Sequence, residues 1–275
     1  MGWNIDMWSD IKQKILKLEK LDQGRAIFGA RSHQYRFHPV ASLGAVRECE
    51  ARLGVSLPDE LRLFYMQLSN GGVAPNYGLR SLEGLRDYFK PHLEFPGAEY
   101  YRELARQEGY FCEDDDDDEL DDDEKDYFEI PHDYVQGLIA IIEEGCGHQT
   151  CLITSGENIG NVVYVSNDGC ITETNKKLTD LYQNWVDGAI QAFERVISFI
   201  DTDLSMEEIK QETRHELRGY SVDSLIVSLI GAQKPRELFF KGGLRFGGHA
   251  QGLWYEEKLH NYRRRKKLVN HQSSD

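Results

Sequence analysis

The residues best suited to chemistry in this 275-residue chain are carboxylates gathered in one segment. Between Leu93 and Glu129 there are 17 acidic and three basic residues, so this segment has a net charge of −14 while the whole chain has −15. In the run from Glu113 to Asp126, closely spaced carboxylates repel one another and bury little apolar surface, which favours a disordered surface loop. The alternative interpretation is a mimic of a nucleic-acid backbone that attracts the basic cleft of a nuclease. The candidate contact residues are Asp114, Asp115, Asp116, Asp117, Asp118, Asp121, Asp122 and Asp123.

Metal binding is a second chemistry that the side chains suggest. Cys146, His148 and Cys151 are close in sequence, but their spacing fits no zinc knuckle and a fourth ligand is missing. A turn with buried thiols is therefore the favoured interpretation. The acidic segment also lacks the alternating ligands and the glycine of a calcium loop. We expect no metal and no cofactor.

Catalytic motifs are the third chemistry to consider, and none is convincing. Thr154-Ser155-Gly156 lacks the flanking glycine pattern of a nucleophile elbow, and Lys241-Gly242-Gly243 lacks the ending of a phosphate-binding loop. The nine histidines are scattered singly along the chain. The sequence therefore predicts a protein that is not an enzyme.

One stretch, residues 53–72, predicts how the chain folds around a short helix. Gly54 suits the left-handed end of a preceding helix from about Ser42, and Pro58 suits a first helical position. Leu61, Phe64, Tyr65 and Leu68 then repeat at helical spacing and form one apolar face. Asn70-Gly71-Gly72 ends the helix, and the loop that follows should be exposed. Asn70, Asn76 and Tyr77 are therefore weaker candidates for partner contacts.

The remaining pattern predicts an α+β domain with a central antiparallel meander. Four short apolar segments separated by glycine-bearing turns predict strands at 138–142, 150–154, 162–166 and 170–174, and Asp168-Gly169 favours a tight hairpin. A first helix is expected to be capped by Ser9, and His33 to Phe37 alternates as a short edge strand would. A long closing helix should cover the sheet with a stripe of Leu181, Trp185, Ala189, Ala192, Val196 and Phe199.

The order of three segments resembles the SUKH superfamily, whose name includes the yeast cell-wall regulator Smi/Knr. They are the acidic helix ending in Leu53-Gly54 with Leu57-Pro58, the central strands from Gly137 to Thr154, and Leu181-Tyr182-Gln183-Asn184-Trp185 at the start of a closing helix. The resemblance covers residues 5–200. It implies a non-enzymatic binding protein, commonly an immunity protein that neutralises a toxin delivered between bacterial cells. The alternative is a regulatory protein-binding scaffold related to the fungal members.

Domain limits and location follow from composition. We expect a domain at 1–202 with an acidic insertion at 93–129, and a C-terminal extension at 203–275 of unassigned fold. The extension holds a capping box at Ser205 and Glu208 and a basic run from Arg263 to Lys267, which favours a solvated tail. Five cysteines are an odd number, and no apolar run is long enough to span a membrane. The sequence predicts a cytoplasmic protein that binds a basic toxin, without direct binding to nucleic acid or membrane.

Overall fold

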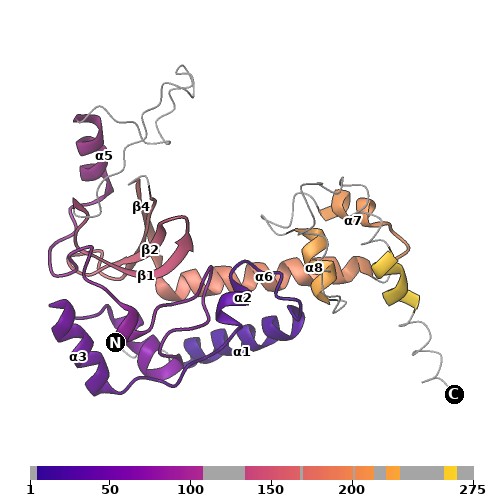
Figure 1. Cartoon of the computed structure of the whole chain (residues 1–275), viewed down its shortest axis with the longest axis horizontal. Helices are drawn as coiled ribbons and strands as arrows, with labels where there is room; N and C mark the ends of the chain where they lie inside the picture. Colours follow the sequence, from indigo (N-terminus) through magenta and orange to yellow (C-terminus); the bar gives the residue numbers. More distant parts are fainter. Residues whose placement is uncertain are drawn as a thin grey trace, which may run out of the picture. The chain divides into compact units, whose positions relative to one another are not determined.

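The computed structural model describes residues 5–107, 134–167, 170–200, 202–213, 221–229 and 257–264 (Figure 1). The chain forms two compact units that are interleaved in sequence. The first contains residues 1–12 and 29–183, and the second contains residues 13–28 and 184–275. The domain limit at residue 202 stays a prediction.

The first unit is built on one four-stranded antiparallel sheet. Its strands are β1 (Leu138–Gly145), β2 (His148–Ile153), β3 (Asn161–Val165) and β4 (Ile171–Lys177), which pair in that order. Pairing continues beyond β1 through three single antiparallel bridges, from Ile142 to Leu79, from Leu79 to Gly72 and from Gly72 to Phe37. The predicted meander and the α+β class are confirmed. Between Tyr77 and Arg80, Leu79 is the residue that takes part in these bridges.

One face of this sheet is covered by the segment that precedes it in sequence. Buried side chains from all four strands pack with Phe89, Ala98 and Tyr101 in one apolar cluster. Ala98 and Tyr101 belong to α5 (Ala98–Gln107), and Phe89 follows the 3₁₀ turn η2 (Leu82–Gly84). The sheet therefore depends on α5 for part of its core.

The helices near residue 53 form largely as the sequence predicts. In α3 (Leu43–Leu53) the Ser42 hydroxyl accepts from the Ala45 N–H at 3.2 Å, and Gly54 ends the helix in the left-handed region. Pro58 is the N-cap of α4 (Asp59–Leu63) and not its first helical residue. A π-helical turn, η1 (Phe64–Leu68), continues α4, and the four residues of the predicted apolar face are all buried.

An aromatic cluster joins distant parts of the first unit. The rings of Trp8 and Phe64 meet edge to face at 5.3 Å, and Tyr182 lies 5.3 Å from Phe64. Trp8 comes from α1 (Ile5–Leu21) and Tyr182 from α6 (Leu178–Ile200). At the start of α6, the Glu60 carboxylate accepts from the Thr179 N–H and hydroxyl, both at 3.0 Å, which satisfies an otherwise open helix N-terminus.

The second unit is held by a buried carboxylate. Asp22 is 1% exposed and accepts the N–H groups of Ala26 at 2.6 Å and Ile27 at 3.1 Å. Ser228 donates to Asp22 at 2.6 Å and accepts the Gly24 N–H at 2.8 Å. Because Ser228 belongs to α8 (Val222–Leu229), the C-terminal extension is bonded to the loop after α1.

Two features of the C-terminal extension match or modify the predictions. The capping box at the start of α7 (Met206–Thr213) is confirmed, since Ser205 and Glu208 bond each other's backbone N–H groups at 2.8 and 3.2 Å. Arg263, in the helix at 257–264, donates to the carbonyls of Ile200 at 2.6 Å and Phe199 at 3.3 Å. Arg263 is therefore attached to the end of α6, and the solvated-tail interpretation is wrong for this residue.

Two local predictions are wrong, and a third is wrong in part. Residues 30–33 form the short helix α2 (Ala30–His33), and Gln34 and Tyr35 have positive φ, so no strand can run from His33 to Phe37. Ser9 lies inside α1 and cannot cap it. The stripe predicted for α6 is partly wrong. Ala189, Ala192 and Val196 are buried as predicted, but Leu181, Trp185 and Phe199 are only half-buried, and the neighbouring Tyr182, Val186 and Phe193 are buried.

The described helices were also compared with the requirements of a bilayer span. In the part of the chain that the structure describes, no helix combines the length and the hydropathy needed to cross a membrane.

Leu61→Asp is expected to destabilise the protein by about 3 kcal/mol or more, because it would bury an unpaired charge at a side chain that is 0% exposed. Leu43→Asp is the matched control, since Leu43 is 44% exposed and should change stability by at most about 0.5 kcal/mol. Thermal or urea unfolding measures both variants. Equal melting of Leu61→Asp and the parent protein would contradict the described core.

Ser228→Ala is expected to lower the free energy of unfolding by about 1–3 kcal/mol, because it removes a hydrogen-bond partner from the Gly24 N–H and from one Asp22 oxygen, next to a buried carboxylate. Ser198→Ala removes an exposed hydroxyl that donates only to the Arg195 carbonyl, and it should cost at most about 0.5 kcal/mol. Urea unfolding of the two variants compares these costs, and equal midpoints would show that α8 is not anchored through Asp22.

Candidate functional site

The predicted acidic contact residues lie in a segment whose two ends are described. Asp114 to Asp118 and Asp121 to Asp123 fall within 108–133, outside the described residues. The chain enters this segment from α5, which ends at Gln107, and leaves it at Tyr134, four residues before β1. The structure therefore defines the anchor points of the acidic residues.

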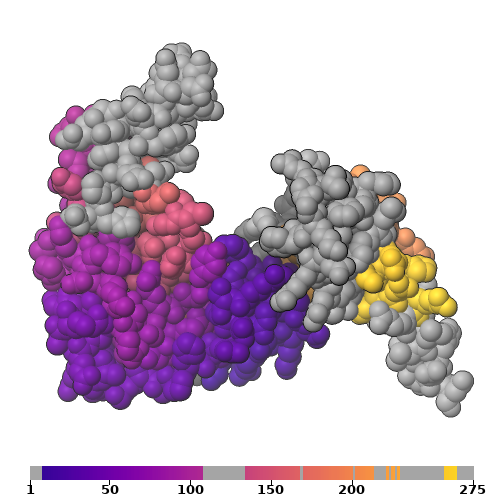
Figure 2. Space-filling model, viewed as in Figure 1, coloured from indigo at the N-terminus to yellow at the C-terminus, as the bar shows by residue number. Residues whose placement is uncertain are grey.

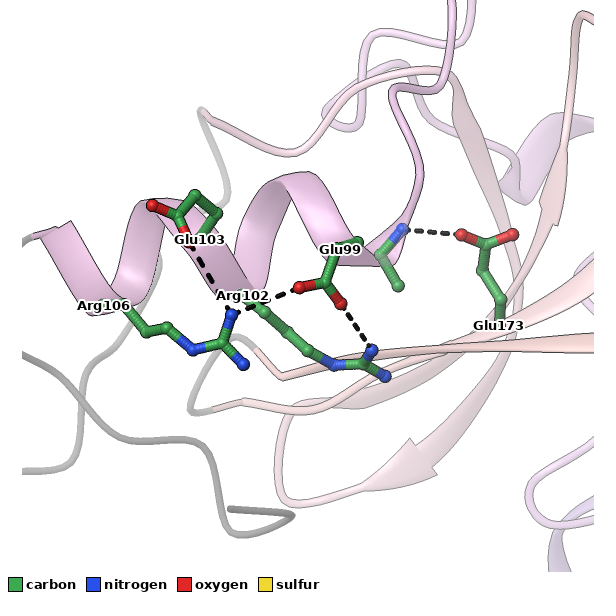
Figure 3. Close-up of polar contacts among 6 residues, drawn as sticks. Glu99, Arg102, Glu103, Arg106 and Glu173 are labelled. Carbon is green, nitrogen blue, oxygen red and sulfur yellow. Dashed lines mark hydrogen bonds and ion pairs between the residues drawn. The ribbon is translucent and has the colours of Figure 1, made fainter.

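The entry side is fixed to the sheet through α5. The Glu173 carboxylate of β4 accepts the Ala98 N–H at 2.6 Å, at the helix N-terminus, where the dipole favours negative charge (Figure 3). Ala98, Tyr101 and Ala105 are buried at helical spacing. The insertion expected at 93–129 is therefore not only a surface segment, because α5 supplies part of the sheet's apolar cluster.

The outer face of α5 carries a closed set of ion pairs (Figure 3). Glu99 pairs with Arg102 at 3.1 Å and with Arg106 at 3.2 Å, and Arg106 also lies 3.7 Å from Glu103. Hydrogen bonds from Arg102 and then from Arg106 lower the pKa of Glu99, so this carboxylate stays ionised. These four side chains sum to zero charge, and the two arginines are engaged by the glutamates of their own helix.

The exit side is fixed by Gln136. Its backbone N–H donates to the Tyr101 hydroxyl at 3.0 Å, and its side-chain amide donates to the Glu94 carbonyl at 3.0 Å. Gly137 next to it has a φ of +72°, and a Cβ there would lie 2.3 Å from the Phe95 nitrogen. The close approach of these two backbones requires glycine. Gln136 therefore joins three segments, near Glu94, Tyr101 and Tyr134.

Asn70 has a structural role within the chain. Its side-chain oxygen accepts the Leu82 N–H at 3.0 Å, and its amide donates to Glu83 at 3.3 Å. Both polar ends of the side chain are used by the segment 81–83. The structure gives Asn70 the role of holding a turn, and its contact with a partner stays a prediction.

Asn76 and Tyr77 lie near the end of β1 that is farther from Tyr134. Tyr77 is 44% exposed, its backbone N–H donates to the Glu143 carbonyl at 3.4 Å, and its ring lies over Gly145. Asn76 is half-buried with a φ of 52°. At the extended rise of a strand, the distance from Leu138 to Gly145 is about 23 Å. The structure therefore places Asn76 and Tyr77 at the opposite end of β1 from Tyr134, where the chain leaves residues 108–133.

A polar cluster that the sequence did not predict lies at the hairpin end. Arg80 donates to the Gln149 side chain at 2.9 Å and lies 3.7 Å from Glu143, while its carbonyl accepts the Tyr65 hydroxyl at 2.7 Å. Glu143 and Gln149 are register partners across β1 and β2. No sequence signal identifies this cluster, because it depends on strand register. Tyr100 was not among the predicted contact residues either, although the helical spacing of Ala98, Tyr101 and Ala105 places it off the buried face of α5.

The three residues considered for zinc binding lie at different positions along the hairpin of β1 and β2. Cys151 is 0% exposed within the apolar cluster, and burial strongly raises the pKa of its thiol, which keeps it protonated. Cys146 is exposed at the turn with a φ of 52°, and His148 begins β2. Among the described residues, no group of three or more His, Cys, Asp or Glu side chains is arranged to hold a metal ion.

Comparison with known proteins gives a family and no individual relative. The model of the SMI1 / KNR4 family (SUKH-1) matches residues 41–187, a range that includes α3, α4, α5 and the whole sheet. No curated protein matches the chain, and no solved structure matches it. The family match covers more than half of the 275 residues and includes the segments that carry the resemblance seen in the sequence. The chain belongs to the SMI1 / KNR4 family (SUKH-1).

Proposed function

We propose that this protein is an immunity protein that binds a cognate bacterial toxin in a one-to-one complex, covers its active site or substrate groove and performs no chemistry of its own. Membership of the SUKH-1 family supports a protein-binding role. The distribution of charge supports the kind of partner, which is a basic protein and specifically a nuclease toxin. A nuclease binds the phosphate backbone of nucleic acid through positive charge, so an acidic protein can compete for the same groove.

The observation that carries this proposal is the concentration of charge next to fixed anchor points. Residues 93–129 hold a net charge of −14, and the rest of the chain sums to −1. The nearest described arginines, Arg102 and Arg106, are paired with Glu99 and Glu103 on α5. These two arginines and two glutamates sum to zero charge, so the net charge of −14 belongs to the other residues of 93–129.

Binding of the cognate toxin is the direct test of this function. The toxin domain encoded by the reading frame next to this gene should form a one-to-one complex with the protein in solution and should lose toxicity in cells that express both. A regulatory scaffold would instead bind a cellular protein and leave toxicity unchanged. Lack of both the complex and the protection would refute the immunity function.

Replacing residues 113–126 by a neutral Gly/Ser linker of equal length is expected to leave folding intact, because loop composition at constant length adds little entropy cost. Association with the toxin should slow by roughly tenfold to a thousandfold at low salt and lose most of its salt dependence. Stopped-flow measurements at several salt concentrations determine both quantities.

A charge control separates this local effect from net charge. Glu48, Glu157 and Glu207 are exposed carboxylates outside the acidic segment, and their combined replacement by Gln should change association by at most about twofold to threefold, because separated surface charges are screened within about 10 Å. If the linker variant keeps the association rate and salt response of the parent protein, the acidic segment has no part in recognition.

A further inference from the structure

Three exposed apolar side chains lie around the anchor points of the acidic segment. Tyr134 is 61% exposed, Tyr100 is 54% exposed and Leu93 is 37% exposed. We call these three residues the tyrosine patch. The segments that carry them meet at Gln136, two residues after Tyr134. The Gln136 side-chain amide donates to the Glu94 carbonyl, and Glu94 follows Leu93. The Gln136 backbone N–H donates to the hydroxyl of Tyr101, which follows Tyr100. The segments that carry these three side chains are therefore held together at Gln136.

Aromatic rings pack against one another next to Tyr100 of the tyrosine patch. The Tyr100 ring meets the buried Tyr101 ring edge to face at 5.2 Å, and Phe95 stacks on Tyr101 at 6.1 Å. Tyr101 itself is 1% exposed. A side chain that is already positioned loses little conformational entropy when a partner binds, and tyrosine is enriched among residues that dominate binding energy.

Charge identifies the occupant as a basic protein surface. Gln107 and Tyr134 are joined in sequence by residues 108–133, which contain 15 acidic residues and one basic residue. A basic partner drawn to these charges arrives beside Tyr100 and Tyr134. Tyrosine rings attract Lys and Arg side chains through cation–π interaction, which complements a surface rich in those residues.

The hairpin end of the sheet offers a weaker surface for the same partner. The Tyr77 ring already packs over Gly145, and Arg80 places a positive charge 3.7 Å from Glu143. This end of β1 also lies about 23 Å along the strand from Leu138, the end that follows Tyr134.

We propose that the toxin docks on the tyrosine patch at the α5 end of the sheet, with Tyr100 and Tyr134 as its anchoring side chains, and not on the hairpin end at Asn76 and Tyr77. This inference rests on the proposed function and adds where the partner binds. It also assigns different kinetic roles, because the acidic segment accelerates association while the tyrosine patch slows dissociation.

The test measures association and dissociation of the toxin domain encoded by the adjacent reading frame, with the full-length protein and three alanine variants. Tyr100→Ala and Tyr134→Ala should each raise the dissociation rate by about tenfold or more and leave the salt dependence of association unchanged. Tyr77→Ala is the matched control, an exposed tyrosine at the other end of β1, and should leave the dissociation rate within about twofold. Tyr100→Phe should keep most of the affinity because the ring remains.

The outcomes distinguish this inference from the function on which it rests. If the parent protein binds the toxin and protects cells, but Tyr77→Ala raises the dissociation rate while Tyr100→Ala and Tyr134→Ala do not, the docking site is wrong and the immunity function stands. If the parent protein does not bind the toxin, the docking site and the immunity function are both wrong. Thermal melting of each variant shows that it is folded, and Tyr134→Ala provides a second test because Tyr134 makes no ring contact with Tyr101 in the described contacts.

Discussion

The sheet of β1 to β4 has to be covered on both faces, and this requirement organises the first unit. Five consecutive residues of β1 and five of β2 are buried, so side chains that point to opposite faces are all removed from water. One face is closed by Phe89, Ala98 and Tyr101, which come from the segment just before the acidic residues. Burial of an aromatic side chain stabilises by about 1.5–3 kcal/mol, so α5 is held against the sheet by the same interaction that completes the core.

This use of α5 has a consequence for recognition. The helix that covers the sheet also carries the chain into the acidic segment, and Gln136 fixes the exit beside it. A charged segment that cannot supply its own core is thereby attached at both ends to a well-packed surface. In the proposed complex, long-range attraction and short-range contact are supplied by neighbouring parts of the chain, which lets each be changed without the other.

Several elements could be predicted from local pattern because their physics is local. The start of α3 near Ser42, its end at Gly54, the four strands and the capping box at Ser205 depend on residues within one turn or one hairpin. The short strand at His33 to Phe37 was predicted from alternation alone, and the positive φ values at Gln34 and Tyr35 overrule it. The face of α6 was predicted correctly at Ala189, Ala192 and Val196 but not near the start of the helix, because burial there is set by distant partners of Tyr182 such as Phe64 and the Val73 carbonyl.

The sequence by itself determined the family, the order of the strands and the concentration of negative charge, since each is written in residue types and short spacings. Only the tertiary structure decided that α5 is core, that Gln136 brings Leu93, Tyr100 and Tyr134 to one place, and that Asn76 and Tyr77 lie at the other end of β1. Contacts such as that of Asp22 with Ser228 join residues more than 200 positions apart. No local pattern encodes them, because they arise when the whole chain buries its apolar surface and satisfies the polar groups left inside.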